Sequence, residues 1–128
     1  MERIRLSQRK GSYKIEAEAL LVGEDLVLSI WGGSKPHIGA TALAVPRPSL
    51  KDPTVTSSTS SVLTRVGHKE DEIVKRVSER ISAALGRTAV VSAGIHWDFL
   101  GEEDVEAVRS ICEELTERLI HKILGIGK

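Results

Sequence analysis

EDEIVKRVSERISAALGRTAVVSAGIHW, residues 70–97, decides the fold because its hydrophobic period changes once along the stretch. From Ile73 to Leu85 the apolar residues form a stripe at helical spacing, behind an acidic first turn and ahead of Gly86, which is typical of an amphipathic helix. Residues 88–97 are instead a short apolar run, which indicates a buried strand entered directly after the helix. If a strand also precedes the helix, the unit is a right-handed crossover between parallel strands.

The segment before this unit carries strand propensity. TVTSSTSSVLTRV, residues 54–66, is rich in β-branched and hydroxyl residues and is bounded by proline and glycine, which favours a strand over the alternative of a Ser/Thr linker. Residues 38–45 are small and apolar enough for a central strand, which Pro46 and the prolines after it are expected to end. The sequence therefore predicts two neighbouring strands before the helix.

Nearer the N-terminus, residues 12–31 predict a hairpin. Apolar and charged residues alternate from Tyr13 to Ala19, Gly23 interrupts the pattern, and residues 26–31 resume as an apolar run. Residues 3–8 add a short edge strand.

A second helix is expected from Glu102 to Gly125, after an acidic start. Its apolar stripe consists of Val105, Val108, Ile111, Cys112, Leu115, Leu119 and Ile123. The fold class is α+β (α/β): a mixed, mainly antiparallel sheet of five or six strands, a C-terminal β-α-β-α segment, and two helices on one face, all in a single domain over residues 1–128. Because two helices cover only one face, we expect a homodimer or a larger homo-oligomer.

Composition narrows the class of protein. Eighteen basic residues balance eighteen acidic ones without a long basic run, and only four residues are aromatic, so binding to nucleic acid is not expected. Cys112 is the single cysteine, which excludes an internal disulfide and fits a reducing compartment. No window approaches the roughly 18 apolar residues of a membrane span, so we expect a cytoplasmic protein.

Three histidines, His37, His68 and His96, each lie beside a glycine in KPHIGA, GHKEDE and AGIHWD. The predicted topology brings all three to one edge of the sheet, where both helices also begin and offer free N–H groups to an anion. Asp98 is placed to orient the imidazole of His96. Taken singly, each histidine is more often structural, as a cap or a polar strand end.

The same residues allow more than one chemistry. Three imidazoles could hold zinc, but His37, His68 and His96 lack the close pair that usually anchors such a set. The hydroxyls of residues 57–61 could donate to phosphate or ribityl oxygens, or simply line an exposed or oligomeric strand. The sequence contains no recognisable motif of a nucleophilic serine or cysteine with its activating partners. It therefore allows ligand binding and does not require catalysis.

Read together, PHIGATALAVPRPS, SSTSSV, GHKEDEIV and AGIHWDFLGEEDV resemble the small LpdD-type subunit encoded with gallate and related hydroxyarylic acid decarboxylases of the UbiD class. The resemblance covers about residues 10–120, with Glu70 where an aspartate is expected. It implies a fold similar to proteasome assembly chaperones, oligomeric association, and a role as chaperone or carrier of prenylated flavin mononucleotide (FMN). The positions it marks as cofactor-binding are His37, Gly39, Ser58, Thr59, Ser60, Ser61, His68, Lys69, His96 and Asp98; no catalytic or metal residue is assigned.

Three hypotheses follow for function. The first is a non-catalytic carrier of prenylated FMN or FMN for a UbiD-type decarboxylase, with the phosphate at the helix N-termini, Lys69 and the strand hydroxyls, and the ring near the histidines. The second is a metal-dependent enzyme that uses His37, His68 and His96 as ligands. The third is a purely structural subunit of a decarboxylase.

Overall fold

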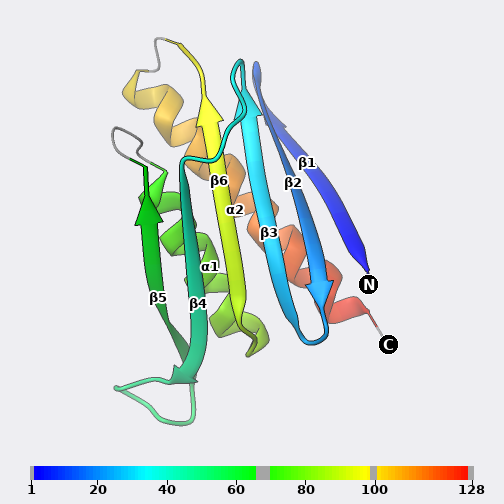
Figure 1. Cartoon of the computed structure of the whole chain (residues 1–128), viewed down its shortest axis with the longest axis vertical. Helices are drawn as coiled ribbons and strands as arrows, with labels where there is room; N and C mark the ends of the chain where they lie inside the picture. The colour runs from blue at the N-terminus through cyan, green and yellow to red at the C-terminus, as the bar shows by residue number, and fades with distance from the viewer. Residues whose placement is uncertain (1, 66–69, 99–100, 127–128) are drawn as a thin grey trace.

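Six strands form one mixed sheet, and two helices lie side by side on one of its faces (Figure 1). The structure is a computed structural model that describes residues 2–65, 70–98 and 101–126. The elements in chain order are β1 (Arg3–Lys10), β2 (Tyr13–Val22), β3 (Asp25–Gly33), β4 (Ala40–Pro48), β5 (Thr56–Thr64), α1 (Asp71–Leu85), β6 (Ala89–His96) and α2 (Glu102–Gly125). The predicted fold class, with its C-terminal β-α-β-α segment, is confirmed.

The strand order is β1-β2-β3-β6-β4-β5, so the last strand in the sequence lies near the centre of the sheet. β6 pairs parallel with β3 and antiparallel with β4. Because β5 is also antiparallel to β4, β5 and β6 run in the same direction, as the crossover predicted, but β4 lies between them. α1 therefore carries the chain across β4 before β6 inserts beside β3.

The prediction that Pro46 ends the fourth strand is wrong. β4 continues to Pro48, and its pairing with β5 covers the whole strand. Pairing with β6, however, stops at Ala44, so Pro46 and Pro48 lie where β4 has a neighbour on one side only. Proline is tolerated on such an edge because no partner there needs its missing N–H group.

Alternation of buried and exposed residues separates the two faces of the sheet. The face toward the helices is aliphatic, and its buried members include Ile15, Ala17, Ala19, Leu26, Leu28, Ile30, Ala40, Ala42, Ala44, Ala89, Val91 and Ala93. α1 packs on β4, β5 and β6, while α2 packs on β1 and β2. On β4 every buried residue of this face is alanine, which lets α1 approach the strand closely. In the part of the chain that the structure describes, the opposite face is covered by neither helix, and we call it the open face (Figure 1).

Contacts at the start of α2 fix this helix beside the end of β6. The rings of Tyr13 and Trp97 pack edge to face with centroids 4.9 Å apart. A hydrogen bond to Asp104 raises the pKa of the Tyr13 hydroxyl above its usual value, and Asp104 also accepts from the N–H of Gly101 at 3.0 Å. Within the described residues, neither helix is long and apolar enough to cross a membrane.

Substitutions on the two faces of β4 should differ in their effect on stability. Ala42→Leu adds volume beneath α1 where the alanine is almost fully buried, so we expect a loss of about 1–3 kcal/mol in the free energy of unfolding. Val45→Leu on the open face is the matched control and should change stability by less than about 0.5 kcal/mol. Urea denaturation measures both. Equal losses would contradict the assignment of the faces.

Candidate functional site

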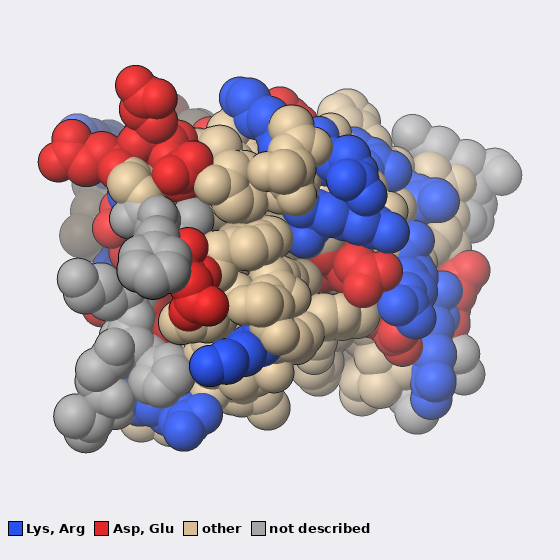
Figure 2. Space-filling view, turned by 90° about the horizontal axis from the view of Figure 1, so that it is seen from above, with Lys and Arg blue, Asp and Glu red and all other residues tan. Residues whose placement is uncertain are grey.

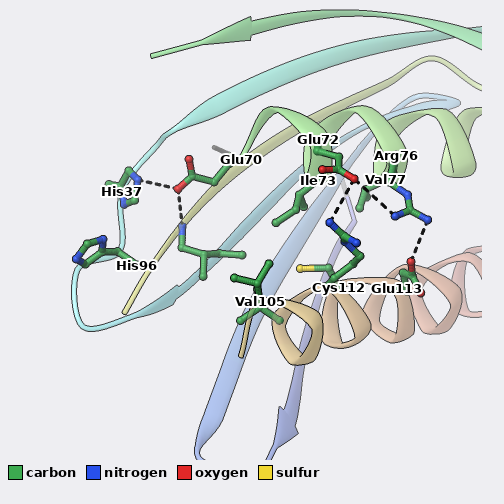
Figure 3. Close-up of a pocket in the computed structure, with 13 residues that line it drawn as sticks. His37, Glu70, Glu72, Ile73, Arg76, Val77, His96, Val105, Cys112 and Glu113 are labelled. Carbon is green, nitrogen blue, oxygen red and sulfur yellow. Dashed lines mark hydrogen bonds and ion pairs between the residues drawn. The ribbon is translucent and has the colours of Figure 1, made fainter. Parts of the chain in front are cut away.

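A cavity of about 430 Å³ lies between α1 and α2, beyond the end of β6 (Figure 3). Its described lining residues are His37, Glu70, Glu72, Ile73, Arg76, Val77, Ile95, His96, Val105, Val108, Arg109, Cys112 and Glu113. The histidines lie at one end, Glu72, Arg76 and Glu113 at the other, and aliphatic side chains between them (Figure 3). A ligand of this cavity would meet polar groups at both ends and an apolar middle.

His37 and Glu70 form a largely buried pair at the histidine end. The ring atom Nε2 of His37 is 3.1 Å from Oε1 of Glu70, while Nδ1 is 2.9 Å from the carbonyl oxygen of Lys35. Both ring nitrogens of His37 thus face an oxygen atom, which fixes the orientation of the ring at this end of the cavity.

Glycines allow the backbone to place this pair. A Cβ atom at Gly94 would overlap the carbonyl group of His37, so the segment before β4 can cross the end of β6 only because position 94 has no side chain. A Cβ at Gly39 would overlap the carboxyl group of Glu70. The N–H of Gly39 donates to the carbonyl of Ala93 at 2.9 Å, which fixes the same crossing.

The structure brings His37 and His96 to the same cavity. Nε2 of His96 is 3.0 Å from Oδ1 of Asp98, so this carboxylate orients the imidazole. His68 and Lys69, which the sequence analysis also selected, lie outside the described residues. Among the residues that are described, no three His, Cys, Asp or Glu side chains are grouped so as to hold a metal ion.

The hydroxyl run of β5 does not line the cavity. Ser58 donates to the carbonyl of Glu79 at 2.8 Å and Ser60 to the carboxylate of Glu79 at 2.6 Å, so both tie β5 to α1. Partial burial raises the pKa of Glu79, but hydrogen bonds from Lys75 and Ser60 outweigh it, so the net pKa is below its usual value. Thr59 accepts from Arg47 at 2.6 Å, and by strand alternation it shares the open face with Ser61. A role of these hydroxyls in cofactor binding stays a prediction.

Several lining residues were not selected from the sequence. Arg76 and Arg109 resemble the exposed charges of any amphipathic helix, and only the contact between α1 and α2 gives them a cavity to line. Glu70 is 7% exposed, an unusual burial for a residue at a helix start. In the sequence, only the position of Glu70 directly after the GHK motif pointed to it as a site residue.

Cys112 forms part of the apolar wall and is not a reactive thiol. Burial, and secondarily the charge of Glu113, raises the pKa of the Cys112 thiol to about 12. The thiolate is the nucleophilic form, so at neutral pH this side chain acts as a small apolar group. Its place in the buried stripe of α2 is as the sequence indicated.

Charge is distributed unevenly at this end of the molecule. Acidic side chains gather on the side where α2 begins, and Lys and Arg gather on the opposite side, with an uncharged band between them (Figure 2). The first turn of α2 contains Glu102, Glu103 and Asp104, and that of α1 contains Asp71 and Glu72. These carboxylates complement the positive ends of the helix dipoles, so an anionic ligand would be repelled by all of them except Glu72, which is paired with Arg76 and Arg109.

The family of prenylated flavin chaperone LpdD-like domains matches residues 9–124. The chain belongs to this LpdD-like family. Membership of this family indicates that the chain acts as an accessory chaperone. Protein LpdD of Lactiplantibacillus plantarum (strain ATCC BAA-793 / NCIMB 8826 / WCFS1) is 27% identical over 115 residues, which cover 87% of this chain and 78% of that protein.

The fold of this LpdD-like protein has a solved counterpart. A crystal structure of a chaperone complex for yeast 20S proteasome assembly aligns over 91% of this chain and 99% of the other, with a TM-score of 0.50 and 15% sequence identity. The likeness concerns the fold alone. It confirms the expected similarity to proteasome assembly chaperones.

Replacing Gly94 should disturb the histidine end of the cavity. We expect Gly94→Ala to lower the free energy of unfolding by about 1–3 kcal/mol, because the added methyl group meets the backbone of His37 and not a movable side chain. Gly125→Ala, at a helix position with open space around it, is the control and should be neutral or stabilising by up to about 1 kcal/mol. Chemical denaturation gives both values, and a neutral Gly94→Ala would contradict the close crossing.

Proposed function

We propose that this LpdD-like protein is a non-catalytic carrier or chaperone of prenylated FMN, or of FMN itself, for a UbiD-type hydroxyarylic acid decarboxylase. The observation that carries the proposal is the amphipathic cavity between α1 and α2. Its volume of about 430 Å³ lies within the range of roughly 300–1,000 Å³ that is usual for small-molecule and cofactor sites. Membership of a flavin chaperone family supplies the cofactor class.

The lining residues fit a flavin. Ile73, Val77, Val105 and Val108 offer an aliphatic slot to a flat ring system, which gains by leaving water. At one end the His37–Glu70 pair and the imidazole of His96, which Asp98 orients through Nε2, give the polar edge of the flavin a polar surface to face. Bound flavin would supply the chemistry that the decarboxylase needs, whereas the chain itself would orient the ring and limit its exposure to water.

A carrier without turnover also agrees with the side chains of the cavity. The thiol of Cys112 is held protonated by burial, so it does not attack a bound ring. The described residues that line the cavity come from α1 and the residue before it, from α2, from the end of β6 and from the segment before β4, so a ligand can leave without unfolding of the sheet. Release toward a client enzyme needs such an exit.

Blocking the cavity should abolish flavin binding. Val105 lines the cavity and is 45% exposed, so Val105→Trp can fill the slot without disturbing the core. In a fluorescence titration with FMN we expect its affinity to fall at least about tenfold, through lost contact with the apolar wall. Val22→Trp is the matched control, since Val22 is 46% exposed at the end of β2 and does not line the cavity.

Two other outcomes would count against the carrier. Equal affinities for wild type and both variants would place the flavin elsewhere. A wild-type protein that binds no flavin, yet forms a stoichiometric complex with the decarboxylase, would favour the purely structural subunit.

We also infer that two copies associate through the open face. Its part formed by β3, β6, β4 and β5 carries no charged residue at its centre, where the outward residues are Val27, Ser29, Val90, Ser92, Thr41, Leu43, Thr59, Ser61 and Leu63. Like charges would meet across a twofold axis, so an uncharged patch suits a self-complementary contact. From strand spacing this four-stranded part measures roughly 600 Å², which is near the lower end of the area per partner that a specific dimer buries.

A charge on this face should separate the copies. Wild-type protein is expected to have twice the 13.9 kDa chain mass in sedimentation equilibrium, whereas Leu43→Glu should be a monomer because both copies would bury a carboxylate. Leu50→Glu is the control, since Leu50 is 91% exposed in the connection after β4. A monomeric wild type, or a dimeric Leu43→Glu, would refute association through this face.

A further inference from the structure

Two arginines from different helices line the end of the cavity that is distant from the histidines. Arg76 of α1 and Arg109 of α2 both contribute to the wall, and Arg76 lies at the opposite end from His37 and His96 (Figure 3). Among the described lining residues these two guanidinium groups are the permanent positive charges. Their position on two elements allows both to reach one group held between the helices.

A single carboxylate now links the two guanidiniums. Oε1 of Glu72 is 3.3 Å from Nη2 of Arg109 and 3.9 Å from Nη1 of Arg76. Each arginine also has a carboxylate of its own: Glu113 lies 3.3 Å from Arg76, and Glu106 lies 2.8 Å from Arg109. Among the described residues, Glu72 is thus the carboxylate that the two arginines share, and its departure frees donors on both of them.

Glu72 is easily replaced by another anion. Its side chain is 58% exposed, so it returns to water without a large desolvation effect, and exposed ion pairs of this kind contribute little to stability. The donors it leaves are planar N–H groups, which match the oxygen atoms of a phosphate in the bidentate manner. A phosphate with up to two negative charges would interact with both arginines more strongly than one carboxylate does.

We propose that Arg76 and Arg109 form the phosphate subsite of the cavity, and that Glu72 occupies this subsite until a phosphate monoester replaces it. The identification of that monoester with the phosphate of a flavin mononucleotide rests on the proposed function. The ligand then lies along the cavity with its phosphate between the helices and its ring toward His37 and His96.

This placement differs from a phosphate at the helix N-termini. The first turns of α1 and α2 already carry Asp71, Glu102, Glu103 and Asp104, and acidic side chains gather on that side of the molecule (Figure 2). They offset the helix dipoles and oppose a second anion. The arginine end is more favourable because its cations are permanent and its one shared carboxylate can leave.

FMN and riboflavin, which lacks the phosphate, are the probes that test the subsite. For wild type we expect FMN to bind at least about tenfold more tightly than riboflavin, because only FMN forms charged hydrogen bonds between its phosphate and the two arginines. The double variant Arg76→Gln/Arg109→Gln should lose this preference while its riboflavin affinity stays within about twofold. Glu72→Gln should have the opposite effect and raise the affinity for FMN about two- to threefold, since it removes the competing charge.

Arg80→Gln is the matched control for the arginine variants. Arg80 forms a bidentate ion pair with Glu117 at 2.7 and 3.0 Å, which also joins α1 to α2 but lies outside this cavity. Its loss should leave both flavin affinities unchanged. Equal binding of FMN and riboflavin by wild type, or an equal loss of both probes in the double variant, would overturn the subsite.

A second measurement separates the subsite from the proposed function. The Nε–H signals of Arg76 and Arg109 are followed by NMR during titration with inorganic phosphate, with Arg80 as the internal reference. If neither flavin binds but phosphate shifts the signals of Arg76 and Arg109 alone, the flavin carrier is refuted and the phosphate subsite stands. If neither FMN nor phosphate shifts these signals, the subsite is refuted, whatever riboflavin does.

Discussion

The crossing of the His37 backbone over Gly94 is the contact on which the site depends. β6 lies between β3 and β4, so the segment that joins those two strands must pass over its end. The passage is close enough that a Cβ atom at Gly94 would overlap the carbonyl of His37. It places His37 beside Glu70 at the start of α1, and it brings His96 at the end of β6 to the same cavity. Three segments that are distant in sequence thus meet through one position without a side chain.

The cavity arises from how the two helices share one face of the sheet. α1 covers β4, β5 and β6, α2 covers β1 and β2, and the slot lies between the two helices at the end of β6. Its floor is made of residues that also belong to the core, such as Val77 and Cys112. Its far end is closed by exposed ion pairs between Glu72, Arg76 and Arg109, which are weak individually. A rigid floor with a loosely closed end would suit the carrier proposed above.

Much of this arrangement could be predicted from the sequence because local periods encode it. The alternation of apolar and charged residues in residues 13–19 predicted a strand. The stripe that includes Ile73, Val77 and Ile81 predicted a helix. Strand order was less accessible: the insertion of β6 between β3 and β4 depends on long-range pairing, which no local pattern records. The prediction that Pro46 ends the strand was wrong because proline is excluded from strands that are paired on both sides. Beyond Ala44, β4 is paired on one side only.

The residues of the candidate site likewise include some that the sequence could predict and some that it could not. His37 and His96 were predicted to meet because the start of one predicted strand and the end of another lie at the same edge of the sheet. The arginine pair could not be predicted, because a cation on the polar side of a helix carries no signal of what faces it until the helices are packed. The hydroxyls of Ser58 and Ser60 show the reverse case: a run that looked suited to a ligand is engaged by Glu79 of α1.

The alternation of β4 also has an evolutionary consequence. Ala42 and Leu43 are neighbours in the chain, yet Ala42 lies beneath α1 and Leu43 lies on the open face. Selection on the packing of α1 therefore acts on Ala40, Ala42 and Ala44, and selection on what the open face contacts acts on Thr41, Leu43 and Val45. Each face of β4 is thus free to change without altering the other, one residue at a time.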